Sequence, residues 1–244
     1  MTPLSSEGEV NWVDAGDEPV SVTPSPDQSS HLQPPQQRHQ IPLVMVETAF
    51  LASAASLIYW INYYFPLGPV LRIFFPIPIA LLYLRRGDRA AWMGTLVSGL
   101  LLSVLMGPTR SILYVMPYAL LGVQLGWLWR RGSSWYFSLL TGSLLGTLGS
   151  LFYFWLISLL VSEDLWRYTI NQITIWLNWL VLRFGLLTQP DRLWIELVAI
   201  ALIIFNSVLY LFTVHIVSLI LFDRLKTPIP RPPEWVQILF EYDY

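Results

Sequence analysis

Residues 132–162, GSSWYFSLLTGSLLGTLGSLFYFWLISLLVS, decide the class of this protein. The stretch carries no charged side chain, and it is longer than the ~20 apolar residues that cross the hydrocarbon core of a bilayer as a helix. Similar uncharged runs lie on both sides of it, at residues 48–71, 73–84, 90–109, 111–129 and 197–222. The chain is therefore predicted to be an integral membrane protein with the lipid bilayer as its solvent.

The composition of the whole chain agrees with this class. Hydrophobic residues make up 55% of the 244 residues and charged residues only 12%, whereas charged residues are roughly 25% of a soluble domain. The net charge of −2 gives no indication of a nucleic-acid partner. Because the chain has no cysteine, disulfides, thiolate metal sites and cysteine nucleophiles are excluded.

The uncharged runs predict an all-α polytopic fold, a bundle of six transmembrane helices with one additional amphipathic helix. The predicted spans lie at about 43–65, 68–84, 89–106, 110–130, 134–161 and 193–222. Residues 1–42 are rich in Pro, Ser and Gln, with too little apolar surface to offset the entropy of ordering, and they predict a disordered cytoplasmic tail. Residues 223–244 are expected to form a cytoplasmic C-terminal tail.

The basic residues alternate in number between the two sides of this six-span arrangement. One side receives Arg38, Arg85, Arg86, Arg89, Arg130, Arg131, Arg224, Lys226 and Arg231. The other side receives Arg72, Arg110, Arg167, Arg183 and Arg192. Because cytoplasmic loops carry the excess of Lys and Arg, we expect both termini in the cytoplasm, with the bundle in a bacterial inner membrane or a thylakoid-type membrane.

Segment 164–187 tests the span count, because it is long enough to cross and carries few charges. Arg167, Asn171, Thr174 and Asn178 recur at spacings of three and four residues and form one polar stripe on an apolar helix. The segment either lies in the outer interface or spans with its stripe toward a polar cavity. We favour the interfacial helix, since a seventh span would move the basic C-terminal segment outside.

The second span is irregular, because Pro76 and Pro78 lie inside it and each removes a backbone donor. Arg72 lies one turn into this span. An Arg at that depth either extends to the headgroups or joins a broken helix in a site for an anionic ligand. Pro117 interrupts the fourth span in the same way, and Asn206 is the polar residue nearest mid-membrane in the sixth.

Small residues at four-residue spacing mark surfaces where helices can approach closely. The first span carries two such pairs, Ala49 with Ser53 and Ala52 with Ser56. Packing inside the bundle and docking on a partner protein both fit the pattern.

Catalytic motifs are absent from the sequence. It has no H-E-x-x-H zinc pair, no G-x-S-x-G elbow and no G-x-x-x-x-G-K-[ST] phosphate loop, and its His residues form no cluster. We therefore expect no enzyme activity, no metal site and no cofactor.

Three stretches carry a resemblance to a known family: FPIPIALLYLRRGDRAAWMGTLVSGLLLSVLMGP, MPYALLGVQLGWLWRRG and LILFDRLKTPIPRPPEW. They share a proline-containing second helix before the basic turn Arg85, Arg86 and Gly87, and a helix with Gly122 and Gly126 that ends in two Arg residues. In these features the chain resembles the YybS-like family of uncharacterised bacterial membrane proteins. That family is distantly similar to the substrate-binding S components of energy-coupling-factor transporters.

The resemblance implies a compact S-component-like bundle with both termini inside. It also implies that the first helix docks on a membrane-embedded coupling subunit, here through Ala49, Ala52, Ser53 and Ser56. Since the chain has no ATP-binding motif, transport would require separate coupling and ATPase partners.

Two functional hypotheses follow. In the first, the protein binds or transports a small molecule, and the candidate lining residues Arg72, Asn171, Asn178 and Asn206 converge with the polar stripe on one cavity of at least ~300 Å³. In the second, it is a non-catalytic membrane scaffold or assembly factor that presents its first helix, the 164–187 helix and its tails to partner proteins.

Overall fold

The computed structural model describes residues 35–65, 69–183, 191–227, 229–230 and 233. Contacts divide the chain into residues 1–39 and 40–244, and the contacts discussed here lie within the second unit. The part of the chain that the model describes is helical and contains no strand. Its elements are α1 (Pro35–Tyr64), α2 (Pro69–Ile73), α3 (Ile77–Arg86), α4 (Asp88–Met106), α5 (Pro108–Tyr114), the π-helix η2 (Val115–Ala119), α6 (Leu120–Arg130), α7 (Trp135–Val161), α8 (Leu165–Arg183) and α9 (Arg192–Arg224).

Five of the described helical segments are long and apolar enough to cross a membrane: Pro42–Tyr64, Asp88–Met106, Pro108–Arg130, Trp135–Val161 and Arg192–Arg224. They correspond to five of the six predicted spans. The remaining one, predicted at 68–84, is divided into the short helices α2 and α3 around Pro76. The all-helical class is thus confirmed, whereas the count of six spans is not.

The boundaries of the two tails differ from those expected. Helix α1 begins at Pro35 rather than near residue 43, since proline is well accommodated in the first turn of a helix. The rest of the N-terminal tail, residues 1–34, lies outside the described residues. In the expected C-terminal tail, Ile229 is buried against the hydrophobic core, so the chain beyond α9 contributes to packing.

Helix α3 occupies the centre of the bundle although it is too short to span. All residues from Ile77 to Tyr83 are buried. Its closest neighbour is α6, where a Cβ atom added at Gly122 would lie 2.6 Å from the Pro76 carbonyl oxygen. At Gly126 an added Cβ would collide with the Tyr83 side chain. Small residues on α6 therefore allow α3 to pack in the interior, the role expected of such spacing in a membrane bundle.

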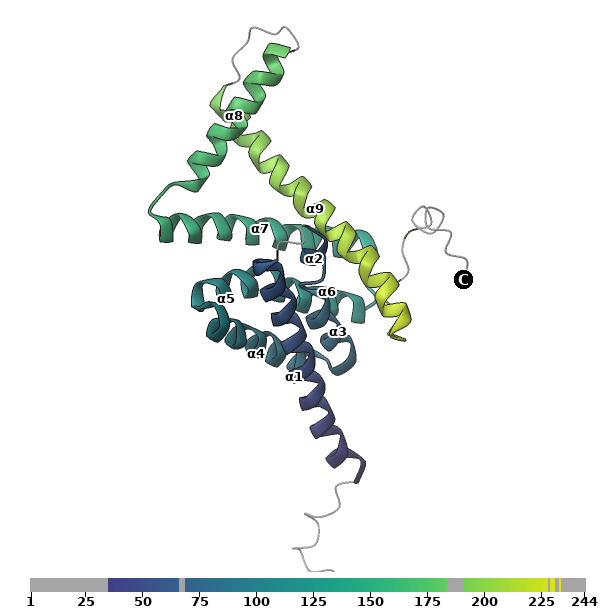
Figure 1. Cartoon of the computed structure of the whole chain (residues 1–244). Coiled ribbons are helices and arrows are strands. Elements are labelled where there is room, and N and C mark those ends of the chain that lie inside the picture. The colour runs from purple at the N-terminus through teal and green to yellow at the C-terminus, as the bar shows by residue number, and fades with distance from the viewer. Residues whose placement is uncertain (1–34, 66–68, 184–190, 228, 231–232, 234–244) are drawn as a thin grey trace, which may run out of the picture. The chain divides into compact units, whose positions relative to one another are not determined.

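Helices α7, α8 and α9 follow one another, and each contacts the other two (Figure 1). Helices α7 and α9 also contact the central elements, through α6 and η2 and through α2 and α3 respectively. Helix α8 contains no buried residue. Helices α7 and α9 thus lie against the central elements, and α8 packs on these two helices.

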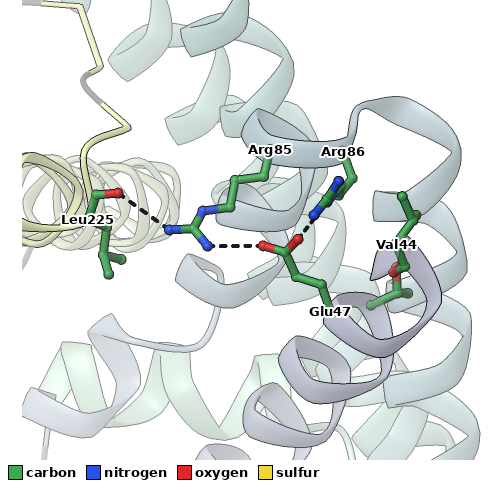
Figure 2. A network of polar contacts seen from close by, with 6 residues as sticks. Val44, Glu47, Arg85, Arg86 and Leu225 are labelled. Atoms are coloured by element: carbon green, nitrogen blue, oxygen red, sulfur yellow. Dashed lines mark hydrogen bonds and ion pairs between the residues drawn. The ribbon is translucent and has the colours of Figure 1, made fainter. Parts of the chain in front are cut away.

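An ion-pair network joins three helices at the end of the bundle where α3 terminates (Figure 2). Glu47 of α1 lies between Arg85 and Arg86, with N···O distances of 3.0 Å and 2.5 Å. Arg85 also donates to the carbonyl oxygen of Leu225, just beyond α9, at 3.4 Å. The network fixes the turn of Arg85, Arg86 and Gly87, where Gly87 adopts a φ of +84° that favours glycine.

Candidate ligand-binding site

Two interruptions of helical backbone meet on one cavity. The first is the break between α2 and α3, where the Arg72 carbonyl oxygen accepts from the Phe75 N–H at 3.2 Å and from the Tyr210 O–H at 3.1 Å. The second is η2, a π-helix that contains Pro117. Proline removes a backbone donor, and π-helical turns recur at functional sites. Irregular backbone at membrane depth is tolerated where it is buried in protein or lines a cavity.

The cavity between these elements has a volume of about 930 Å³. Residues from α1, α2, the end of α4, α5, η2, α7, α8 and α9 line it, together with the junctions at Phe75 and Gly107. This volume is at the upper end of the ~300–1,000 Å³ typical of small-molecule sites. The cavity is therefore large enough for a drug-sized solute with water around it.

The charged groups on the cavity wall are both cations, Arg72 and Arg110. Arg110 donates to the Tyr63 hydroxyl at 2.6 Å, and its guanidinium carbon lies 3.8 Å from the centroid of the Tyr63 ring. Among the residues that the structure describes, neither Arg forms an ion pair, and the lining contains no Asp or Glu. The wall consequently offers positive charge without a compensating carboxylate.

Aromatic rings form much of the remaining wall. Tyr59 lies at the centre of this cluster, with its ring centroid 5.1 Å from that of Phe75 and 6.5 Å from that of Tyr118. Phe75 and Tyr118 contact each other edge to face at 4.9 Å. Tyr153 and Phe154 of α7 also line the cavity. Rings held in edge-to-face contact present rigid apolar surface, with phenol groups as polar ends.

Asn62 adds a polar atom that lacks a partner. Its Oδ1 atom is buried without a hydrogen-bond partner in the described part of the chain, and Asn62 lines the cavity. An amide oxygen accepts hydrogen bonds, and an unpaired buried acceptor costs about 1–3 kcal/mol. A ligand or water in the cavity that donates to this atom would remove that cost.

The sequence-predicted lining residues do not all lie together. Arg72 and Asn206 both line the 930 Å³ cavity. Asn171 instead lines a second cavity of about 780 Å³ between α8 and α9, with Arg167 and Thr174 of the same stripe. Asn178 lines neither cavity and is exposed. The opposite face of α8, through Thr169 and Ile173, borders the cavity that contains Arg72, so the predicted convergence of the stripe with Arg72 does not occur.

The predicted docking residues on α1 divide into two pairs. Ala52 and Ser56 are fully buried, and the Ser56 hydroxyl donates to the Ser98 carbonyl oxygen of α4 at 3.1 Å. Ala49 is exposed and Ser53 is partly exposed. The first pair therefore packs α1 inside the bundle, and the second remains on the surface.

Sequence reasoning missed several of the cavity residues. Arg110 is predicted only as one of the charges between spans, and Asn62 is not among the predicted lining residues. The aromatic cluster was not predicted, because Tyr59, Phe75 and Tyr118 lie far apart in the sequence. The sequence signal that points to the cavity is the pair of prolines, Pro76 and Pro117, because the irregular backbone at each of them borders the cavity. The lining includes no Asp, Glu, His or Cys, so its described residues supply no usual side-chain set for a metal ion.

Comparison with models of protein families identifies a family for this chain. The model of a family described as predicted membrane protein (DUF2232) matches residues 53–241, which covers most of the chain and all residues of the cavity. Neither the curated proteins nor the solved structures contain a match.

Proposed function

The chain belongs to the predicted membrane protein family DUF2232, and on that premise we propose that it is a small-molecule binding subunit of a membrane transport system. The observation that carries this proposal is the 930 Å³ cavity, in which two uncompensated cations, an unpaired amide and an aromatic wall face one space.

We also propose that the chain is similar to the S components of energy-coupling-factor transporters and to the YybS-like family. Two features support it: a proline-broken helix in the interior, and an exposed small-residue pair, Ala49 and Ser53, on α1. The chain has no ATP-binding motif, so it acts without catalysis and requires separate coupling and ATPase subunits. In this proposal both termini lie in the cytoplasm, with the network of Glu47, Arg85 and Arg86 at the cytoplasmic end.

Native mass spectrometry of the protein purified in mild detergent tests the binding function. We expect the wild type to retain a small molecule, and Asn206→Leu to retain less of it. Ile204→Asn is a control of opposite polarity on α9, at an exposed position that does not line this cavity or the pocket beside it, and should leave retention unchanged. A wild-type spectrum without bound small molecule, obtained under conditions that preserve lipid adducts, would contradict the proposal.

Partner docking is tested at the surface pair on α1. Ser53→Leu should abolish co-purification of coupling and ATPase subunits while the protein stays folded. Ala52→Leu does not serve this purpose, because Ala52 is fully buried and its enlargement disturbs packing. If Ser53→Leu leaves the recovery of these subunits unchanged, docking through α1 is contradicted.

A scaffold or assembly factor is the second candidate, and α8 is the observation that favours it. No residue of α8 is buried, and Trp176 and Trp179 are 71% and 58% exposed. Exposed tryptophans serve either at headgroup depth or in a protein interface. Recovery of a stable complex that depends on Trp176 and Trp179, with no bound small molecule, would favour the scaffold.

A further inference from the structure

The chemistry of the cavity wall restricts what it can bind, and this restriction deepens the proposed function and rests on it. Arg72 and Arg110 bring two positive charges to the wall, and the described lining holds no carboxylate. A guanidinium on a cavity wall interacts most favourably with an anion, because charge-assisted hydrogen bonds to a carboxylate or phosphate are stronger than those to neutral acceptors. A cationic ligand would add repulsion, and a neutral ligand would leave both charges uncompensated.

Carboxylate and phosphate groups match the planar donor geometry of Arg. Arg72 is suited to this role because its side chain is exposed and has no acidic partner in the described structure. Its backbone carbonyl, by contrast, is already engaged by Phe75 and Tyr210. The backbone is therefore held in place, and the guanidinium, which hydrogen-bonds to the Tyr118 hydroxyl on the same wall, has no carboxylate partner among the described residues that would compete with a ligand anion.

The aromatic wall indicates the shape of the rest of the ligand. Phe75 is buried and contacts Tyr118 edge to face and Tyr59 at a tilt, so it supports these two partly exposed rings, which present apolar area to the cavity. Flat rings pack well against such surfaces in offset or edge-to-face arrangements. A planar ring adjacent to the anionic group fits this wall better than an extended polar chain.

Asn62 adds a third requirement, because its unpaired Oδ1 atom needs a donor. An anionic group cannot supply one. The ligand should therefore carry an N–H or O–H group in addition to its charge, in the part that approaches α1.

We propose that the cavity binds an aromatic carboxylate that carries an N–H or O–H donor, with Arg72 and Arg110 holding the carboxylate and Asn62 accepting from the donor. The same chemistry, an anion beside apolar surface, is also found in the headgroup of an anionic lipid. The proposal commits to a soluble solute, since the aromatic side chains of the lining favour a planar ring beside the anionic group, and a lipid headgroup contains no such ring.

The test uses four probes of similar size with purified full-length protein in phosphatidylcholine nanodiscs. Indole-3-acetate has both the charge and the N–H donor, 1-naphthaleneacetate has the charge alone, indole-3-acetamide is neutral and tryptamine is cationic. Equilibrium dialysis should give a Kd below about 1 mM for indole-3-acetate, at least about tenfold weaker binding of 1-naphthaleneacetate, and no saturable binding of the other two.

Substitutions of single residues test which side chains determine the affinity for indole-3-acetate. Arg72→Gln and Arg110→Gln should each weaken indole-3-acetate binding by about tenfold or more, and Arg72→Lys should retain part of it. Asn62→Leu should remove the preference for indole-3-acetate over 1-naphthaleneacetate. Arg183→Gln removes an exposed charge outside the cavity and should leave all four affinities unchanged. Thermal unfolding of each variant identifies any that fail to fold.

The outcomes separate this inference from the proposed function. Equal or stronger binding of indole-3-acetamide or tryptamine would overturn the anionic class while leaving a binding function intact. Failure of all four probes, together with a retained small molecule in the native mass spectrum, would also overturn the inference alone. If phosphatidylglycerol competes with indole-3-acetate in the wild type and Arg72→Gln abolishes the competition, the cations belong to lipid headgroups, and the inference is overturned.

Discussion

At the scale of single residues, His215 shows how polar groups are satisfied inside the bundle. His215 is fully buried, with Nδ1 2.9 Å from the Leu211 carbonyl oxygen and Nε2 2.9 Å from the Ser138 hydroxyl. A carbonyl only accepts, so Nδ1 carries the proton and Nε2 accepts from Ser138 of α7. The pair joins α7 to α9 and is enclosed by the rings of Trp129 and Trp135.

We predict that Ser138→Ala lowers the free energy of unfolding by about 1–3 kcal/mol, because it leaves the His215 acceptor buried and unpaired. Ser143→Ala is the matched control on the same helix, since the Ser143 hydroxyl bonds only to the Leu139 carbonyl of its own helix. Thermal unfolding in detergent measures both. Equal stability of the two variants would mean that the bond between the helices contributes nothing.

The ion pairs of Glu47 and Glu196 differ in burial and should differ in effect. The Glu47 side chain is 17% exposed and contacts two Arg residues, whereas Glu196 is 39% exposed and pairs with Arg192 one turn away on the same helix. Glu47→Gln should cost about 1–2 kcal/mol, because it leaves two partly buried cations without their carboxylate. Glu196→Gln should change stability by about 0.5 kcal/mol or less. Chemical denaturation in the same detergent compares them, and a larger effect at Glu196 would contradict the account.

At the scale of elements, the close approach of α3 and α6 depends on glycine. Gly126→Ala would place its Cβ against the Tyr83 side chain, and we predict a loss of about 1–3 kcal/mol from overpacking. Gly146→Ala on α7 is the contrasting substitution, because its Cβ would meet Ser207 at an ordinary 3.5 Å. Gly146→Ala should be neutral or stabilising, since alanine favours helix more than glycine. Unfolding temperatures that rank the two variants the other way would contradict this packing.

The elements were predictable from sequence to unequal degrees. Long uncharged runs predicted α1, α4, α7 and α9, because the bilayer sets both the length and the composition of a span. Prolines at 76 and 117 indicated where the backbone is irregular, although not that one interruption is a break and the other a π-helix.

The direction in which α8 faces was not predictable. The polar stripe identified a distinct face of α8, but contact with α7 and α9 places this face on the 780 Å³ cavity and the opposite face on the cavity of Arg72. A periodic pattern identifies a face and leaves open what lies opposite it. Arg72 and Asn206, both named as candidate lining residues, lie on one cavity, whereas the partners in the aromatic cluster could be identified only from the tertiary structure.

At the scale of the whole molecule, the orientation proposed from the charge bias can be measured directly. Because the chain has no cysteine, a thiol reagent can label it only at a cysteine that is introduced by substitution. Thr109→Cys, beside the cavity, should react with a membrane-impermeant maleimide in intact cells. Ser133→Cys, in the connection between α6 and α7, should react with the maleimide only after the membrane has been permeabilised. Labelling of both from the same side would contradict the proposed arrangement of spans.

If the cavity of Arg72 is a water-accessible ligand chamber within the membrane, side chains on its wall should react with water-soluble reagents, and cysteine labelling at one helical position measures this. Asn206 lines the cavity, while its neighbour Phe205 is 62% exposed and does not. We predict that Asn206→Cys reacts with an impermeant maleimide in intact cells, and that Phe205→Cys, facing lipid, does not. If Asn206→Cys is as unreactive as Phe205→Cys in a folded protein, the space is closed to water and the chamber does not exist.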